Sequence, residues 1–129
     1  MNELVWFDAA GQPVRRVPVD RLQDLRVAGG KVIAPSFKKK LLVFDLAGTK
    51  LWEQATEGFI MAADATADGA TIAVALFGGE VVLFDGEGKC LRRARLPMEA
   101  TLTGLAFSRE GDKLLLATWD GDVLAWRLR

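Results

Sequence analysis

The side chains of this chain that could take part in catalysis or ligand binding are mainly carboxylates and cations, because the sequence has no histidine and a single cysteine. It has 129 residues, with 17 Lys and Arg against 17 Asp and Glu and no net charge. Without histidine there is no imidazole for acid–base catalysis, for a Ser-His-Asp or Cys-His nucleophile, or for metal ligation. The sequence therefore predicts that the protein is not an enzyme, and its balanced charge does not indicate a nucleic-acid partner.

Three aspartates recur at one position of a repeated pattern. Asp8, Asp45 and Asp85 each stand three residues before a glycine. A ring of carboxylates could bind a metal ion, but an aspartate at the start of a turn commonly caps nearby backbone N–H groups, and we expect that role here. Asp120 and Asp122 are too few for a calcium loop. The sequence predicts no metal site and no cofactor.

Aromatic residues occupy the same place in three short segments that each separate two strand-like runs. They are Phe37, Phe77 and Trp119. Aromatic side chains are frequent hot spots of protein interfaces, so these segments are candidates for binding a protein partner. The predicted partner-binding residues are Phe37, Lys38, Lys39, Lys40, Phe77, Trp119 and Asp120.

Other interpretations of these segments stay open. The aromatic rings could cap a hydrophobic core, since repeats tend to reuse packing positions. The run Lys38–Lys40 could be a solvated hairpin tip, or it could meet an acidic partner or a phosphate. It lacks the interleaved aromatic residues and the glycine-rich cradle of a nucleic-acid site, so nucleic acid is not an expected partner.

Cys90 has no second cysteine with which to form an intramolecular disulfide, which favours a reducing compartment. The first residues lack the basic start and the apolar core of a signal peptide. The longest apolar runs have about seven residues, against the roughly 20 that a membrane-spanning helix needs. We expect a cytoplasmic protein without a membrane partner.

The strands predicted to carry these residues belong to an internal repeat. The segment Leu4–Gly11 returns as Leu41–Gly48 and Val81–Gly88, and in shortened form as Val123–Arg127. The aromatic residue that marks each copy, at positions 7, 44, 84 and 126, recurs at steps of 37, 40 and 42 residues. A period near 40 residues suits the four-stranded blade of a β-propeller.

Short runs rich in Val, Ile, Phe and Trp, separated by turns that contain glycine, predict an all-β chain without helices. We name the strands of one blade A to D in chain order. The expected groups hold two, four, four and three strands: C and D at 4–8 and 13–19; A to D at 22–28, 31–36, 40–46 and 50–56; A to D at 60–66, 70–77, 80–85 and 89–96; and A to C at 101–108, 113–119 and 122–128.

This unit resembles a blade of the WD-repeat β-propellers, most clearly in Gly111–Trp126. The segment Phe44–Trp52 is also similar to the Asp-turn-Gly-Trp docking motif of quinoprotein-like propellers. The chain departs from WD repeats in three ways: it lacks the Gly-His pair, Trp119 and Asp120 lie in a B–C loop, and Arg127 stands where the family has Asp. The resemblance implies a propeller that binds other proteins. A quinoprotein-like enzyme would require a cofactor pocket and a metal.

We expect one propeller domain over residues 1–129, divided into a partial blade 1–19, blades at 20–57 and 58–97, and a partial blade 98–129. Ring propellers typically use four to eight blades, so about three blades form an open arc with exposed faces and edges that favour association. A head-to-tail dimer would supply six blades and a trimer nine. Both 4–8 and 122–128 are predicted C strands, so closure displaces one of them.

The sequence therefore predicts a β-propeller scaffold that self-assembles into a closed ring and binds protein partners through the face that carries its B–C loops. Two alternatives concern the architecture: a fragment of a longer repeat protein, or a different β-fold. A third concerns function: a purely structural or engineered assembly module with no external ligand.

Overall fold

The computed structural model describes residues 2–96 and 101–128. The regular secondary structure in those ranges consists of β-strands alone. The strands are β1 (Asn2–Phe7), β2 (Pro13–Val19), β3 (Arg26–Ala28), β4 (Lys31–Ser36), β5 (Lys40–Asp45), β6 (Lys50–Ala55), β7 (Ile60–Ala65), β8 (Thr71–Leu76), β9 (Glu80–Asp85), β10 (Cys90–Arg95), β11 (Leu102–Phe107), β12 (Lys113–Thr118) and β13 (Val123–Arg127). The predicted blade boundary at residues 97 and 98 lies outside the described residues.

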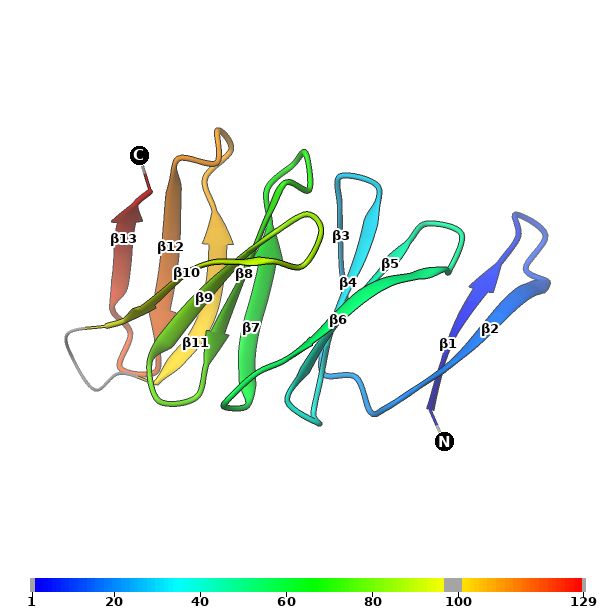
Figure 1. Ribbon diagram of the computed structural model, residues 1–129, viewed down its shortest axis with the longest axis horizontal. Helices are drawn as coiled ribbons and strands as arrows, with labels where there is room; N and C mark the ends of the chain where they lie inside the picture. The colour runs from blue at the N-terminus through cyan, green and yellow to red at the C-terminus, as the bar shows by residue number, and fades with distance from the viewer. Residues whose placement is uncertain (1, 97–100, 129) are drawn as a thin grey trace.

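These strands form four antiparallel sheets in which chain neighbours are hydrogen-bonded neighbours. The sheets are β1-β2, β3-β4-β5-β6, β7-β8-β9-β10 and β11-β12-β13, and we call them blades 1 to 4. Figure 1 shows the blades side by side in chain order, with the two ends of the chain at opposite ends of the row. The predicted all-β fold with four-stranded blades is confirmed, and the groups hold the expected two, four, four and three strands.

One strand is shorter than the sequence predicted. The expected A strand at 22–28 narrows to β3, and its first part makes only an isolated bridge between Leu22 and Ser36. The reason lies in the partner strand, where Pro35 has no amide hydrogen to donate to the ladder. The Pro35 carbonyl still accepts a hydrogen bond from the Gln23 amide at 2.8 Å, so the segment stays attached to the blade without regular pairing.

Apolar side chains pack between the blades as three separate cores, so the central strands of blades 2 and 3 are covered on both faces. Trp6 of blade 1 meets Phe44 of blade 2 edge-on, with ring centroids 6.2 Å apart. Trp52 of blade 2 packs against Phe84 of blade 3 at 5.9 Å. Blades 3 and 4 share a core built around Leu102, Leu105, Leu114 and Leu116. The inter-blade contacts therefore hold the row together.

The connections between strands separate onto two faces. The turns between strands A and B and between C and D lie on one side, in the upper half of Figure 1, and we call this the turn face. The B–C loops 37–39, 77–79 and 119–122 lie on the other side together with the linkers 20–25 and 56–59, and we call this the loop face. The predicted partner-binding residues therefore belong to one side of the molecule.

Candidate functional site

The loop face is built on one hydrogen bond that recurs in three blades. The amide of Phe37 donates to the carbonyl of Arg21, that of Phe77 to Phe59, and that of Trp119 to Thr101, each at 2.8 Å. Each bond ties a B–C loop to the linker that leads into the same blade. The three aromatic residues therefore occupy equivalent, backbone-anchored positions, as their alignment in the sequence predicted.

The aromatic rings of this face are open to solvent. Phe37 is 42% exposed, Phe77 63% and Trp119 78%. This exposure argues against the interpretation that the rings cap the inter-blade cores. It leaves a row of large apolar surfaces across blades 2, 3 and 4, which is the kind of feature that marks an interaction surface.

Phe59 is a fourth exposed ring on the loop face, and sequence reasoning missed it. It lies in the linker before β7, opposite Phe77. The corresponding linker residues in the other blades are Arg21 and Thr101, so the position shows no repeated residue type. The one signal for Phe59 is its hydrogen bond to the predicted aromatic residue Phe77, which only the folded structure shows.

Two cations lie over rings of this face. The Arg21 guanidinium carbon is 4.8 Å from the centroid of the Phe37 ring, and the Lys39 Nζ is 4.8 Å from the centroid of the Phe59 ring. Cations at this distance are attracted by the negative face of the ring. The rings and cations thus form mixed aromatic and basic patches rather than a purely apolar surface.

Lys39 has an unusual backbone conformation. Its φ of 59° lies in the left-handed region, and it is the one non-glycine residue with positive φ among the described residues. Glycines occupy the equivalent positions of the other two B–C loops, Gly79 at 92° and Gly121 at 95°. A side chain in this region costs about 1–2 kcal/mol, and such strain clusters at functional sites.

The three consecutive lysines do not act together. The Lys38 amide donates to the Ser36 Oγ at 2.9 Å, which shapes the loop. The Lys40 Nζ lies 3.9 Å from an Asp20 carboxylate oxygen and 3.7 Å from one of Glu53. Lys40 therefore meets acids of its own chain, while Lys39 is directed toward an aromatic ring. Asp120 stands at the tip of the third loop and is exposed.

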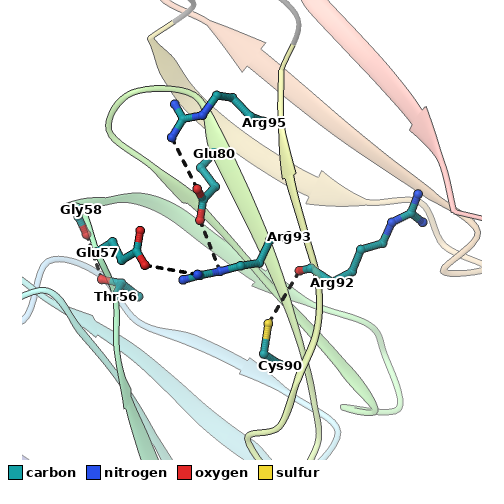
Figure 2. A network of polar contacts seen from close by, with 8 residues as sticks. All are labelled: Thr56, Glu57, Gly58, Glu80, Cys90, Arg92, Arg93 and Arg95. Carbon is teal, nitrogen blue, oxygen red and sulfur yellow. Dashed lines mark hydrogen bonds and ion pairs between the residues drawn. The ribbon is translucent and has the colours of Figure 1, made fainter.

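An ion-pair network fixes the outer strand of blade 3 beside the loop face (Figure 2). The Glu80 carboxylate, at the start of β9, receives Arg93 Nε at 3.4 Å and Arg95 Nη2 at 3.5 Å. Arg93 also pairs with Glu57 in the linker at 3.2 Å, and Arg95 donates to the Gly78 carbonyl at 3.0 Å. Glu80 is the least exposed member of the network. The contacts of Arg93 with Glu57 and of Arg95 with Gly78 anchor the linker and the second B–C loop to β10.

The repeated aspartates are turn caps. In each of the three C–D turns the aspartate Oδ1 accepts hydrogen bonds from the amides two and four residues later, all at 2.9 Å. The backbone amides of Lys89 and Glu87 hold the pKa of Asp85 below its usual value of 3.8. Asp8, Asp45 and Asp85 thus take the role expected for them. Among residues 2–96 and 101–128, no three His, Cys, Asp or Glu side chains are arranged to hold a metal ion.

Cys90 is exposed at the start of β10, and its Sγ faces the carbonyl of Arg92 at 4.0 Å. The chain has no histidine that could activate this thiol. The part of the chain that the structure describes contains no helix of the length and apolarity needed to cross a membrane.

Four-stranded antiparallel sheets, packed face to face in chain order, are the blades of a β-propeller. A solved structure, the C-terminal WD40 domain of Sif2, has this arrangement, with a TM-score of 0.81 and 18% sequence identity. The likeness covers 98% of this chain and 40% of the Sif2 chain. No family model and no curated protein sequence matches the chain. The fold is that of WD40 propeller blades, as the sequence resemblance implied.

Proposed function

We propose that this protein is a scaffold that binds a partner protein through its loop face, and that two copies close into a six-bladed ring. The observation that carries the first part is the set of exposed aromatic rings of Phe37, Phe59, Phe77 and Trp119. Each residue is anchored through its backbone, and cations lie over the rings of Phe37 and Phe59. Aromatic and arginine side chains are enriched in protein interfaces. A loop backbone that is already fixed loses little conformational entropy on binding.

The second part is supported by comparing equivalent positions of the C strands. Leu41 and Val81 are fully buried, because each packs against the blade that follows. Val123 holds the same place in blade 4 and is 71% exposed. Leu115, in the neighbouring strand, is exposed on the same face. The outer face of blade 4 is therefore apolar like an inter-blade surface, and a second copy could cover it.

The unpaired edge of blade 4 also supports ring closure. Among the described residues, β13 pairs only with β12, so one edge of blade 4 is open to a D strand. A β2 strand from a second copy would complete that blade. Closure in this way leaves β1 or β13 as a surplus C strand, and one of them must be displaced. A dimer then has six blades, and a trimer would have nine, which exceeds the usual range.

The proposed activity is binding, with no catalytic step, no metal and no cofactor. Nucleic acid and membranes are not among the proposed partners, and the proposed location is the cytoplasm. A purely structural assembly module, the alternative from sequence, would have no use for rings held in solvent on one face. It would also not explain a lysine kept in the left-handed region at residue 39.

The loop-face proposal is tested with a variant in which Phe37, Phe77 and Trp119 are all changed to Ala. Proteins retained by the wild-type chain are identified by mass spectrometry, and the affinity of each purified candidate is then measured by calorimetry. We expect a partner whose binding weakens by about tenfold or more in the variant, the effect of losing one hot-spot ring. Unfolding temperature and solution mass should not change, because the rings are exposed.

The matched control is Leu46→Ala, which removes an equally exposed apolar side chain from the turn face. It should bind the partner like the wild type. A triple variant that keeps full affinity would overturn the proposal. So would one that loses its fold or its oligomeric state, because that result is expected of an assembly module.

A further inference from the structure

The turn face carries a feature that the proposed function does not use. A cavity of about 470 Å³ opens between blades 3 and 4, on the side opposite the loop face. Thr71 and Arg92 of blade 3 line it together with Gly111 and Leu128 of blade 4. The internal repeat shows what such a space can hold, because blades 2 and 3 form a second pair with equivalent strands, except that blade 3 has a D strand and blade 4 has three strands.

The corresponding space between blades 2 and 3 is filled by the chain itself. The Lys31 ammonium reaches across from β4 and donates to the carbonyls of Gly69 at 3.1 Å and Gly86 at 3.0 Å. The Trp52 indole Nε1 donates to the same Gly86 carbonyl at 3.1 Å. An ammonium group has three donors and no acceptor, so two backbone carbonyls suit it well.

The strand register places Thr71 where Lys31 stands in the preceding blade. Lys31 lies opposite Asp45 in blade 2, and Thr71 lies opposite Asp85 in blade 3. Threonine is too short to cross to the next blade, so its side chain leaves the space open.

The acceptors also have equivalents. Gly69 closes its A–B turn by donating to the Thr66 carbonyl, and Gly111 closes the next A–B turn by donating to Ser108. Gly86 directly follows the last residue of β9, and Leu128 directly follows the last residue of β13. Both Gly111 and Leu128 line the cavity. The backbone positions that accept the lysine at one blade pair thus recur at the next.

Arg92 takes the place of Trp52 but does not fill the space. Both pair with equivalent residues of the C strand, Val43 and Leu83. The Arg92 guanidinium instead lies over the Trp126 ring, 4.8 Å from its centroid. The charged side chains along the cavity are Asp68, Arg92, Arg109 and Glu110, whose formal charges cancel.

We propose that this cavity is a binding site for the side chain of a lysine from a partner polypeptide, held as Lys31 is held between blades 2 and 3. The site takes a primary ammonium on a flexible apolar stem, with the carbonyls of Gly111 and Leu128 as its acceptors. It lies on the turn face, so it is independent of the loop-face proposal and can fail or succeed separately.

The test uses Nα-acetyl-lysine N-methylamide as the probe and the norleucine analogue, which lacks the ammonium, as its control. Backbone amide resonances of the ¹⁵N-labelled chain are followed during titration. We expect saturable shifts centred on Gly111 and Thr71 with the lysine probe and no saturable shifts with the norleucine analogue. Absence of saturation in the wild type, equal shifts with both probes, or shifts centred on the loop face would overturn the proposal.

Two substitutions test the geometry directly. Thr71→Lys should place its own ammonium in the cavity, abolish binding of the probe, and raise the unfolding temperature above that of Thr71→Met, which supplies similar volume without charge. A crystal structure of Thr71→Lys should show the amine within hydrogen-bond distance of the Gly111 and Leu128 carbonyls. Undiminished probe binding by Thr71→Lys would contradict the assignment. If that variant does not fold, the wild-type titration and Thr71→Met, which should also block the probe, decide the question.

Discussion

At the scale of single residues, the backbone of Lys39 gives opposite expectations for stability and for binding. Changing Lys39 to Gly removes the left-handed strain, which is worth about 1–2 kcal/mol, and removes the contact with Phe59, worth about 0.5–1 kcal/mol at an exposed site. We expect the free energy of unfolding in urea to rise by up to about 1 kcal/mol. Affinity for a loop-face partner should fall in the same variant.

The control for this prediction is Lys38→Gly. Lys38 is the neighbouring residue and does not have a positive φ, so glycine there adds freedom to the unfolded chain without relieving strain. That variant should be less stable than the wild type. If Lys39→Gly lowers stability in the same way, the strain argument is wrong.

The Asp85 turn predicts a pH dependence. Hydrogen bonds from the Lys89 and Glu87 amides lower the pKa of this carboxyl in the folded chain, so its contribution to stability is present above the usual value of 3.8 and is lost as the pH falls through the folded pKa. Asp85→Asn should therefore be less stable than the wild type at pH 7, with the difference shrinking below about pH 4. Urea unfolding of both proteins at several pH values measures this difference in the free energy of unfolding. A difference that stays constant with pH would contradict the assignment.

Residues of the loop face could be predicted from sequence only where their type repeats in register. Phe37, Phe77 and Trp119 align, so their shared position was visible. Phe59 occurs in one blade alone, and a repeat comparison carries no signal for a single occurrence. The left-handed backbone of Lys39 recurs at Gly79 and Gly121, so the alignment of a lysine with two glycines was the sequence signal for it.

At the scale of elements, a pair of equivalent glycines separates backbone strain from packing between blades. Gly11 and Gly88 both have positive φ, and each lies three residues after a capping aspartate. A Cβ on Gly88 would come within 2.6 Å of the Trp52 ring, whereas a Cβ on Gly11 would meet nothing within 4 Å. We expect Gly88→Ala to lose about 1–3 kcal/mol more stability than Gly11→Ala, measured by thermal or urea unfolding. Equal losses would show that Trp52 does not pack on this turn.

The elements themselves were largely predictable, because the glycine turns and the apolar runs between them set the strand limits. The main departure, the shortened β3, depends on Pro35 in the partner strand. The Glu80 network was not predictable, since it joins side chains from a linker and two strands whose distances only the folded blade defines. Likewise, the contrast between Lys31 and Thr71 has meaning only once the blades are placed side by side.

At the scale of the whole molecule, the proposed ring depends on the outer face of blade 4. Val123→Lys would place a charge on that apolar face, and burying it without a partner in the dimer would be strongly unfavourable. We expect this variant to be a monomer while keeping the circular dichroism of the wild type. Leu46→Lys, an exposed apolar residue on the turn face, should leave the oligomer intact. A Val123→Lys chain that still assembles would place the contact elsewhere.

The solution mass of the wild-type chain tests the central claim most directly, by light scattering after size exclusion and by native mass spectrometry. The chain has a mass of 14.1 kDa, and the proposed six-bladed ring predicts one discrete species of twice that mass. A discrete species of three times that mass would keep ring closure but replace six blades with nine. A stable monomer of 14.1 kDa would contradict the closure of two copies into a ring.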